Sequence, residues 1–236
     1  MRCPTRIRDR LPRSPYLGAL LGYAIFMGIL FIESVYRPFN EVVSYVLALF
    51  LSALALCIIY SMSAGDLGLR RVGWRPLLKS VGYGFLEFVL LFFTIGYLYY
   101  ISPEAFKGTW TSNVILSKLT LTGVVITFIY YELIAISEEI FFRGAMLGLF
   151  SYNEEKPKLF SGVFAFNLII FTVTQLLPFR TLIGLISGLM GGLIAGTITI
   201  YLRLKYKSIL PTIAAQTTVS VLNVALQVIS LASHAA

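Results

Sequence analysis

Charged residues are scarce in this chain. Only 13% of its 236 residues are Asp, Glu, Lys or Arg, whereas 58% are hydrophobic, and the mean hydropathy is +0.84. Such a composition excludes a soluble domain with a water-facing surface and indicates a protein whose solvent is a lipid bilayer. No polar stretch is longer than a loop, and no fixed repeat is present. We therefore expect one all-α, polytopic membrane domain.

Cysteine and histidine are also rare. The two cysteines lie in different contexts, Cys3 in an Arg-rich segment and Cys57 inside an apolar run, so a disulfide framework has no support. The single histidine, His234, is among the last three residues. Nothing in the sequence indicates a cofactor.

The apolar residues form about seven runs of spanning length, and each predicts a transmembrane helix. The seven runs are Tyr16–Ile32, Val42–Met62, Ser80–Tyr100, Leu119–Phe142, Leu159–Leu177, Thr181–Leu202 and Ser208–Leu231. The first run is too long for a signal peptide and lacks a small-residue cleavage site, so we expect it to stay uncleaved. Residues 1–15 then form a basic cytoplasmic tail, and residues 16–236 form the membrane domain.

The formal charge of +8 is explained by topology. With the N-terminus in the cytoplasm, 15 of the 19 Lys and Arg residues fall on the inner side, and only Arg37, Lys107, Lys118 and Arg180 fall outside. The positive-inside rule thus selects a cytoplasmic N-terminus and an external C-terminus in the cell (inner) membrane. The partner of this basic charge is the lipid bilayer, and we expect no nucleic-acid binding.

Small residues mark two features of the chain. The segment Ser63–Lys79 contains three glycines and Pro76, so it predicts a loop along the inner face. In the sixth run, glycines recur every fourth residue from Gly184 to Gly196, which places them on one helix face. This pattern is typical of close packing between membrane helices.

Ionisable side chains inside the predicted spans are the candidates for chemistry, because a charge at the bilayer centre is costly unless it is paired or used. Glu139 and Arg143 are one helical turn apart and can pair. Glu138 points about 100° away from Glu139 and lacks that partner. It is either a general base or a hydrated acid at the mouth of the helix. Glu87 is interpreted as a partner for a polar group on another helix, and Glu132 as part of the network of Glu139.

The segment Ser137–Gly144, SEEIFFRG, resembles the EExxxR motif of the CPBP family of intramembrane proteases, which includes type II CAAX prenyl proteases. The stretch DLGLRRVGWRP is similar to the loop that precedes the family core. The segments TQLLPFRTLIG and LRLKYKSILPTIAAQTTVSVLN follow the order of its second and third motifs. The resemblance covers about residues 66–223 and implies a bundle with a conical polar cavity in the membrane.

In such enzymes the first Glu activates a water, two histidines position the water or a metal, and an Asn stabilises the oxyanion. The resemblance implies Glu138 as the base and Glu139 with Arg143 as the supporting pair. Phe171 matches the opening of the FxxxH motif, but Gln175 stands at its histidine. In the HxxxN motif, histidine is replaced by Gln216 and Asn by Ser220, with Asn223 one turn further on.

A carboxamide does not titrate near neutral pH and is a poor metal ligand, so this departure argues against metal catalysis. The favoured hypothesis is an inactive or strongly impaired protease homologue. Such a protein would bind a membrane-embedded protein or peptide, prenylated or not, in the cavity.

Two alternatives stay open. The first is an active glutamic endopeptidase with Glu138 as base and the two glutamines as water and oxyanion donors. The second is a transporter with Glu87, Glu132 and Glu138 as a proton path. The sequence shows neither the inverted hydropathy repeats nor the paired broken helices that would support a transporter.

Overall fold

The structure is a computed structural model that describes residues 14–36, 40–106, 120–152 and 161–235, and within these residues it is helical without any strand. The helices are α1 (Pro15–Tyr36), α2 (Glu41–Tyr60), α3 (Trp74–Leu91), the π-helix η2 (Phe92–Gly96), α4 (Tyr97–Ile101), the 3-10 helix η3 (Pro103–Phe106), α6 (Leu121–Glu138), the π-helix η4 (Glu139–Met146), α7 (Leu147–Tyr152), α8 (Gly162–Leu176), α9 (Leu182–Tyr206) and α10 (Leu210–Ala235). Each predicted apolar run corresponds to one of these helices or to a continuous series of them.

Five helices of the described chain are long and apolar enough to cross a membrane, and α8 is a shorter apolar helix. The five are Pro15–Tyr36, Glu41–Tyr60, Trp74–Ile101, Leu182–Tyr206 and Leu210–Ser233. The prediction of a polytopic α-helical membrane protein is therefore confirmed. The basic tail up to residue 13, the loop around Trp110 and the charged turn before Lys158 lie outside the described residues.

Two predicted boundaries were wrong. The inner loop ends at Gly73, and α3 already begins at Trp74, so residues 74–79 are helical. Pro76 does not break this helix because it lies in the first turn, where backbone N–H groups have no partner within the helix. The fourth predicted span ends at Phe142, but the helix continues through η4 and α7 to Tyr152.

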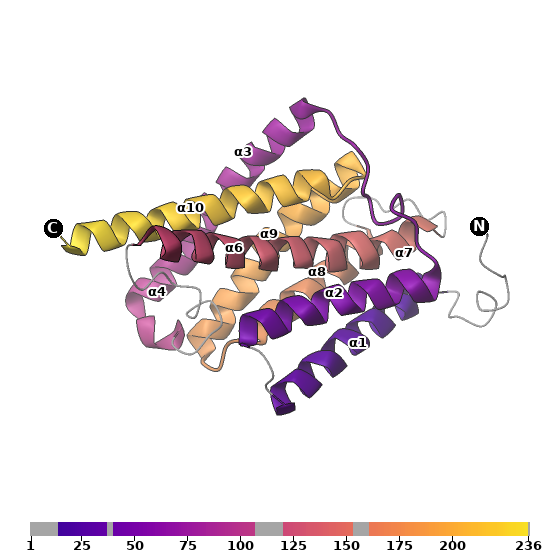
Figure 1. Ribbon diagram of the computed structural model, residues 1–236, viewed down its shortest axis with the longest axis horizontal. Helices are drawn as coiled ribbons and strands as arrows, with labels where there is room; N and C mark the ends of the chain where they lie inside the picture. Colours follow the sequence, from indigo (N-terminus) through magenta and orange to yellow (C-terminus); the bar gives the residue numbers. More distant parts are fainter. Residues whose placement is uncertain (1–13, 37–39, 107–119, 153–160, 236) are drawn as a thin grey trace.

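In Figure 1, α2, α6 and α10 run side by side across the molecule, with α8 and α9 deeper in the view. The helix α1 packs on α2, and α3 packs on α10. The start of α1 and the end of α10 lie at opposite ends of the molecule (Figure 1). This arrangement surrounds the η4 segment with α2, α6, α8 and α9.

The core around η4 is aromatic. The ring of Phe142 lies 4.9 Å from that of Phe141 and 5.2 Å from that of Phe171, both in edge-to-face geometry. Phe26 of α1 contacts Phe141 at 5.6 Å. Such pairs stabilise a core beyond the area that they bury, so the helix that carries the candidate motif is fixed on several sides.

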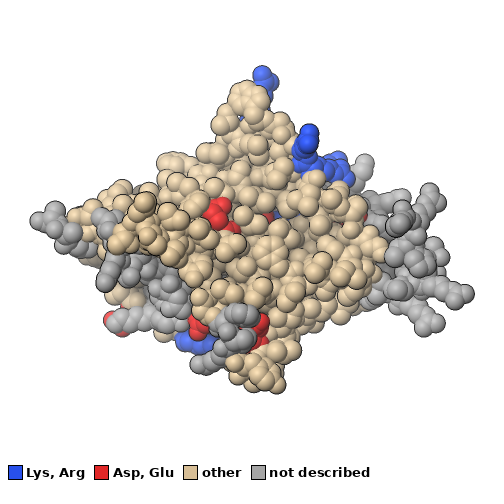
Figure 2. All heavy atoms as spheres, viewed as in Figure 1, with Lys and Arg blue, Asp and Glu red and all other residues tan. Residues whose placement is uncertain are grey.

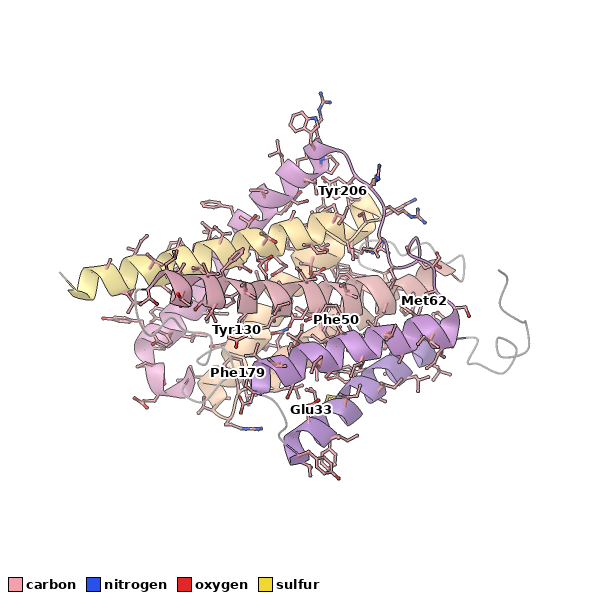
Figure 3. All side chains as sticks on the ribbon, in the orientation of Figure 1. Glu33, Phe50, Met62, Tyr130, Phe179 and Tyr206 are labelled. Atoms are coloured by element: carbon pink, nitrogen blue, oxygen red, sulfur yellow. The ribbon has the colours of Figure 1, made fainter. Side chains whose placement is uncertain are left out.

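The glycine face of α9 packs closely against another helix, as predicted, and that helix is α8. A Cβ atom on Gly188 would lie 2.6 Å from the backbone oxygen of Gln175, and one on Gly192 would lie 2.8 Å from Cα of Thr172. These distances are below van der Waals contact, so only glycine permits this approach. The turn between the helices adds Phe179, labelled in Figure 3, whose ring packs over Gly184 and Gly188. The glycines thereby set the position of Gln175.

Candidate active site

The SEEIFFRG segment lies where the α-helix α6 passes into the π-helix η4. π-Helical turns are rare and are frequently found at functional sites, and they leave carbonyl groups without their usual partners. Two side chains donate to this turn. Asn167 Nδ2 lies 3.0 Å from the carbonyl oxygen of Phe142, and Arg203 Nε lies 2.9 Å from that of Arg143. These contacts fix the turn to α8 and α9.

Glu139 and Arg143 form the predicted ion pair, with Arg143 Nε 3.6 Å from Glu139 Oε1. Both side chains are buried, at 2% and 0% exposure. The guanidinium also donates to the hydroxyl of Thr199 and lies 3.9 Å from the ring centre of Phe171. A buried charge needs this kind of pairing, so the pair supports the position of η4.

Glu138 faces a different set of partners. Its Oε1 accepts a hydrogen bond of 2.7 Å from Tyr45 Oη of α2 and one of 2.8 Å from Gln175 Nε2 of α8. The carboxylate is therefore held by donors from two other helices. The prediction that Glu138 does not share the Arg143 partner agrees with this arrangement.

The contact between Glu138 and Gln175 resolves a conflict between the membrane depths that the predicted spans give to these two residues. If the fifth helix began at Leu159 at the membrane surface, Gln175 would lie about 24 Å deep. The predicted fourth span, in contrast, ends at Phe142, close after Glu138. In the structure α8 begins at Gly162, and Gln175 reaches Glu138 directly. Helix depth therefore cannot be counted from the first apolar residue.

Gln216 lies beside a different carboxylate. Its Nε2 donates a hydrogen bond of 2.8 Å to Oε1 of Glu87, which is fully buried on α3. The prediction that Glu87 partners a polar group on another helix is confirmed. Glu87 also lies within electrostatic range of Glu138, Glu139 and Arg143. The two glutamine contacts thus belong to one acidic cluster.

Other polar residues singled out in the sequence lie on α6 and α10. Glu132 Oε2 accepts a hydrogen bond of 2.7 Å from Thr217, next to Gln216. The Ser220 hydroxyl donates to the carbonyl oxygen of Gln216 within its own helix, at 3.1 Å. This bond uses the only hydroxyl hydrogen of Ser220, so here its oxygen acts only as an acceptor toward other groups. The side chain of His234 lies outside the described residues.

An apolar groove of about 460 Å³ runs between α6 and α10. It is lined by Val124, Val125, Phe128, Val221, Val224, Ala225, Val228 and Ile229. This groove is not the polar cavity that the family resemblance implies. It begins one helical turn from the Glu132–Thr217 hydrogen bond, since Phe128 precedes Glu132 and Val221 follows Thr217 by four residues.

The donors around the carboxylates do not fit the metal that the family resemblance implies. Gln175 and Gln216 each direct Nε2 at a carboxylate oxygen, and an amide nitrogen has no lone pair to give to a metal. An imidazole at either position would supply one. We therefore derive no chemical step through a metal at this site.

A family model described as "Type II CAAX prenyl endopeptidase Rce1-like" matches residues 119–222. This segment contains the EExxxR motif and the positions of Gln175, Gln216 and Ser220 in the expected order. This part of the chain is therefore similar to the type II CAAX prenyl endopeptidases. No curated protein and no solved structure gave a significant match. The family match ends just before Asn223 and does not include α2 or α3, so Tyr45 and Glu87 lie outside it.

Sequence reasoning missed Tyr45 as a partner of Glu138. Tyr45 lies in the second apolar run and is 2% exposed. A buried tyrosine hydroxyl needs a hydrogen-bond partner, so a tyrosine inside an apolar run was the sequence signal for a polar contact. The sequence could not identify that partner, because it is 93 residues away.

Proposed function

We propose that this CAAX-protease-like membrane protein binds a membrane-embedded protein or peptide, prenylated or not, without cleaving it. The binding site is Glu138 with its partners Tyr45 and Gln175, here called the Glu138 cluster. The observation that supports this proposal is the hydrogen bond of 2.8 Å from Gln175 Nε2 to Glu138. Peptide hydrolysis needs a group that takes a proton from water and a group that delivers one to the leaving amine. A carboxamide does neither near neutral pH.

The second glutamine argues in the same direction. Gln216 occupies the other position at which the family resemblance expects a histidine, and it donates to Glu87. Both positions at which the family resemblance expects a histidine are therefore amides. Removal of catalytic groups that act as a set lowers rates by several orders of magnitude.

The retained groups are suited to binding. Glu138 and Gln175 are only partly buried, so a polypeptide that unwinds beside them finds hydrogen-bond partners inside the membrane. The groove between α6 and α10 starts one helical turn from the Glu132–Thr217 hydrogen bond and offers an apolar volume of about 460 Å³ to the rest of the same segment. Polar groups and groove together fit a mostly apolar, membrane-anchored ligand.

The alternative is an active glutamic endopeptidase. One observation favours it: the Gln175 amide has two hydrogens, and Glu138 accepts only one of them. The other can donate to a developing oxyanion while Glu138 deprotonates a water. Such preorganised donors contribute strongly to catalysis in a low-dielectric site.

The two proposals are separated by incubating purified protein in nanodiscs with fluorescent membrane-anchored peptides, with and without a prenyl group. Binding is followed by fluorescence anisotropy, and product by mass spectrometry of the same samples. We expect saturable binding that weakens in Glu138→Ala, with no product at any time. Product that forms with the unaltered chain and disappears in Glu138→Ala would support the endopeptidase instead.

A further inference from the structure

A cluster of tyrosines surrounds one lysine at the end of the bundle where α3 begins and α9 ends. Lys205 Nζ donates a hydrogen bond of 2.6 Å to Tyr201 Oη and lies 4.9 Å from the centre of that ring. The rings of Tyr206 and Tyr83 follow at 5.5 and 5.8 Å. Tyr83 belongs to α3, and its hydroxyl lies 3.4 Å from that of Tyr201. We call these four residues the Lys205 cluster.

The Lys205 cluster has cationic charge that no carboxylate of the described residues neutralises. Within the described part of the chain, Lys205 forms no ion pair with an acidic side chain. Lys79, one turn before Tyr83 on α3, is also exposed, and its charge acts on Tyr201. The charges of two lysines therefore act on Tyr201.

Further cations lie at this end of the molecule. The loop before α3 is joined to the start of α10 by hydrogen bonds from Ser208 Oγ to the Arg70 oxygen and from Ile209 N to the Gly68 oxygen, at 2.9 and 3.0 Å. This connection places the exposed side chains of Arg70 and Arg71 near the end of α9. Figure 2 shows Lys and Arg side chains gathered at this end, over the start of α3 and the preceding loop.

The cluster also contains an unused donor. The hydroxyl of Tyr206 is buried and has no hydrogen-bond partner among the residues that the structure describes. Figure 3 places Tyr206 at the end of the bundle where α10 begins. A buried phenol usually finds a partner, so this hydroxyl would gain one if neighbouring side chains moved to admit a ligand oxygen beside Lys205.

These observations fit one kind of ligand. We propose that the Lys205 cluster binds the phosphate of an anionic phospholipid from the adjoining leaflet. Lys205 and Lys79 supply positive charge, Tyr206 supplies a hydroxyl donor, and the faces of Tyr83 and Tyr201 pack against the glycerol and upper acyl carbons. Tyrosine and lysine at the ends of membrane helices are placed where lipid head groups lie. This binding does not depend on the Glu138 cluster.

The experiment uses the full chain in nanodiscs with equal amounts of phosphatidylglycerol and phosphatidylcholine, followed by native mass spectrometry of the released protein. The unaltered chain is expected to retain phosphatidylglycerol in preference to phosphatidylcholine. Lys205→Gln is expected to weaken that retention about fivefold, the effect of one interfacial cation. Tyr206→Phe, which keeps the ring, should weaken it as well.

Arg180→Gln is the matched control, because this exposed cation lies in the turn between α8 and α9, away from the cluster. It should retain phosphatidylglycerol as the unaltered chain does. Equal retention of the two lipids by the unaltered chain, or equal effects of Lys205→Gln and Arg180→Gln, would overturn the proposal. So would displacement of the lipid by excess inorganic phosphate, because the site would then recognise a soluble anion.

Discussion

Glu87 of α3 and Gln216 of α10 form a partly buried hydrogen bond of 2.8 Å between a residue outside the family match and one inside it. The bond depends on close approach of the two helices, because a Cβ atom on Gly84 would overlap the backbone oxygen of Ala215. One turn of α3 thus contains both Gly84, which packs against α10, and Glu87, which accepts the hydrogen bond from Gln216. Glu87 therefore fixes which way the Gln216 amide points.

Replacing Glu87 with Ala should destabilise the protein by about 1–3 kcal/mol, because the Gln216 amide loses its buried acceptor. Glu87→Gln keeps an acceptor oxygen of the same shape and should cost much less. Thermal unfolding in detergent, followed by the loss of monomer on gel filtration, measures both variants. If both lower the melting temperature equally, the hydrogen bond is not the reason that Glu87 is needed.

Arg143→Leu should destabilise the protein by about 3–5 kcal/mol, because it leaves Glu139 as an uncompensated buried charge. The double variant Arg143→Leu with Glu139→Leu removes both charges and should be more stable than Arg143→Leu alone. The same unfolding assay compares the two. A double variant that is less stable than the single one would contradict the pairing.

Gly188→Ala should destabilise the bundle by about 1–3 kcal/mol, because the new methyl group meets the backbone of Gln175 and the ring of Phe179. The matched control is Gly82→Ala, where no atom lies within 4 Å of the added Cβ. This control should be neutral or slightly stabilising, since alanine favours helix more than glycine does. Equal melting temperatures for the two variants would argue against the close packing of α8 and α9.

The cations of the sequence predict a cytoplasmic N-terminus and an external C-terminus. After both native cysteines are replaced with Ser, a membrane-impermeant maleimide should label Ser233→Cys in intact cells. It should label Arg71→Cys only after the cells are opened. Both positions are exposed, so accessibility to the reagent depends on the side of the membrane. The reverse labelling pattern would show the inverted topology.

Much of the fold follows from local patterns. Apolar runs placed the long helices, although not α7 or η3. A four-residue spacing predicted both the Glu139–Arg143 pair and the glycine face of α9, and the need to pair a buried charge explained Glu87. These features depend on residues within one helix, or on the cost of burying a polar group, so a single sequence contains them.

The contacts between helices were less predictable. Tyr45, Gln175 and Glu138 meet because α2, α6 and α8 adjoin, and periodicity within each helix does not say which helices are neighbours. The π-helical turn after Glu138 was also missed, since SEEIFFRG reads as ordinary α-helix. The start of α3 at Trp74 was misjudged because Pro76 was interpreted as a helix breaker rather than a first-turn residue.

The most direct test of the account asks whether the two glutamines alone silence the site. The unaltered chain, Gln175→His with Gln216→His, and that double variant with Glu138→Ala are compared in lipid, with mass spectrometry of prenylated and unprenylated membrane-anchored peptides. We predict that only the double variant with Glu138 intact forms product, because imidazoles restore proton transfer beside the base. Cleavage by the unaltered chain that depends on Glu138 would contradict the account.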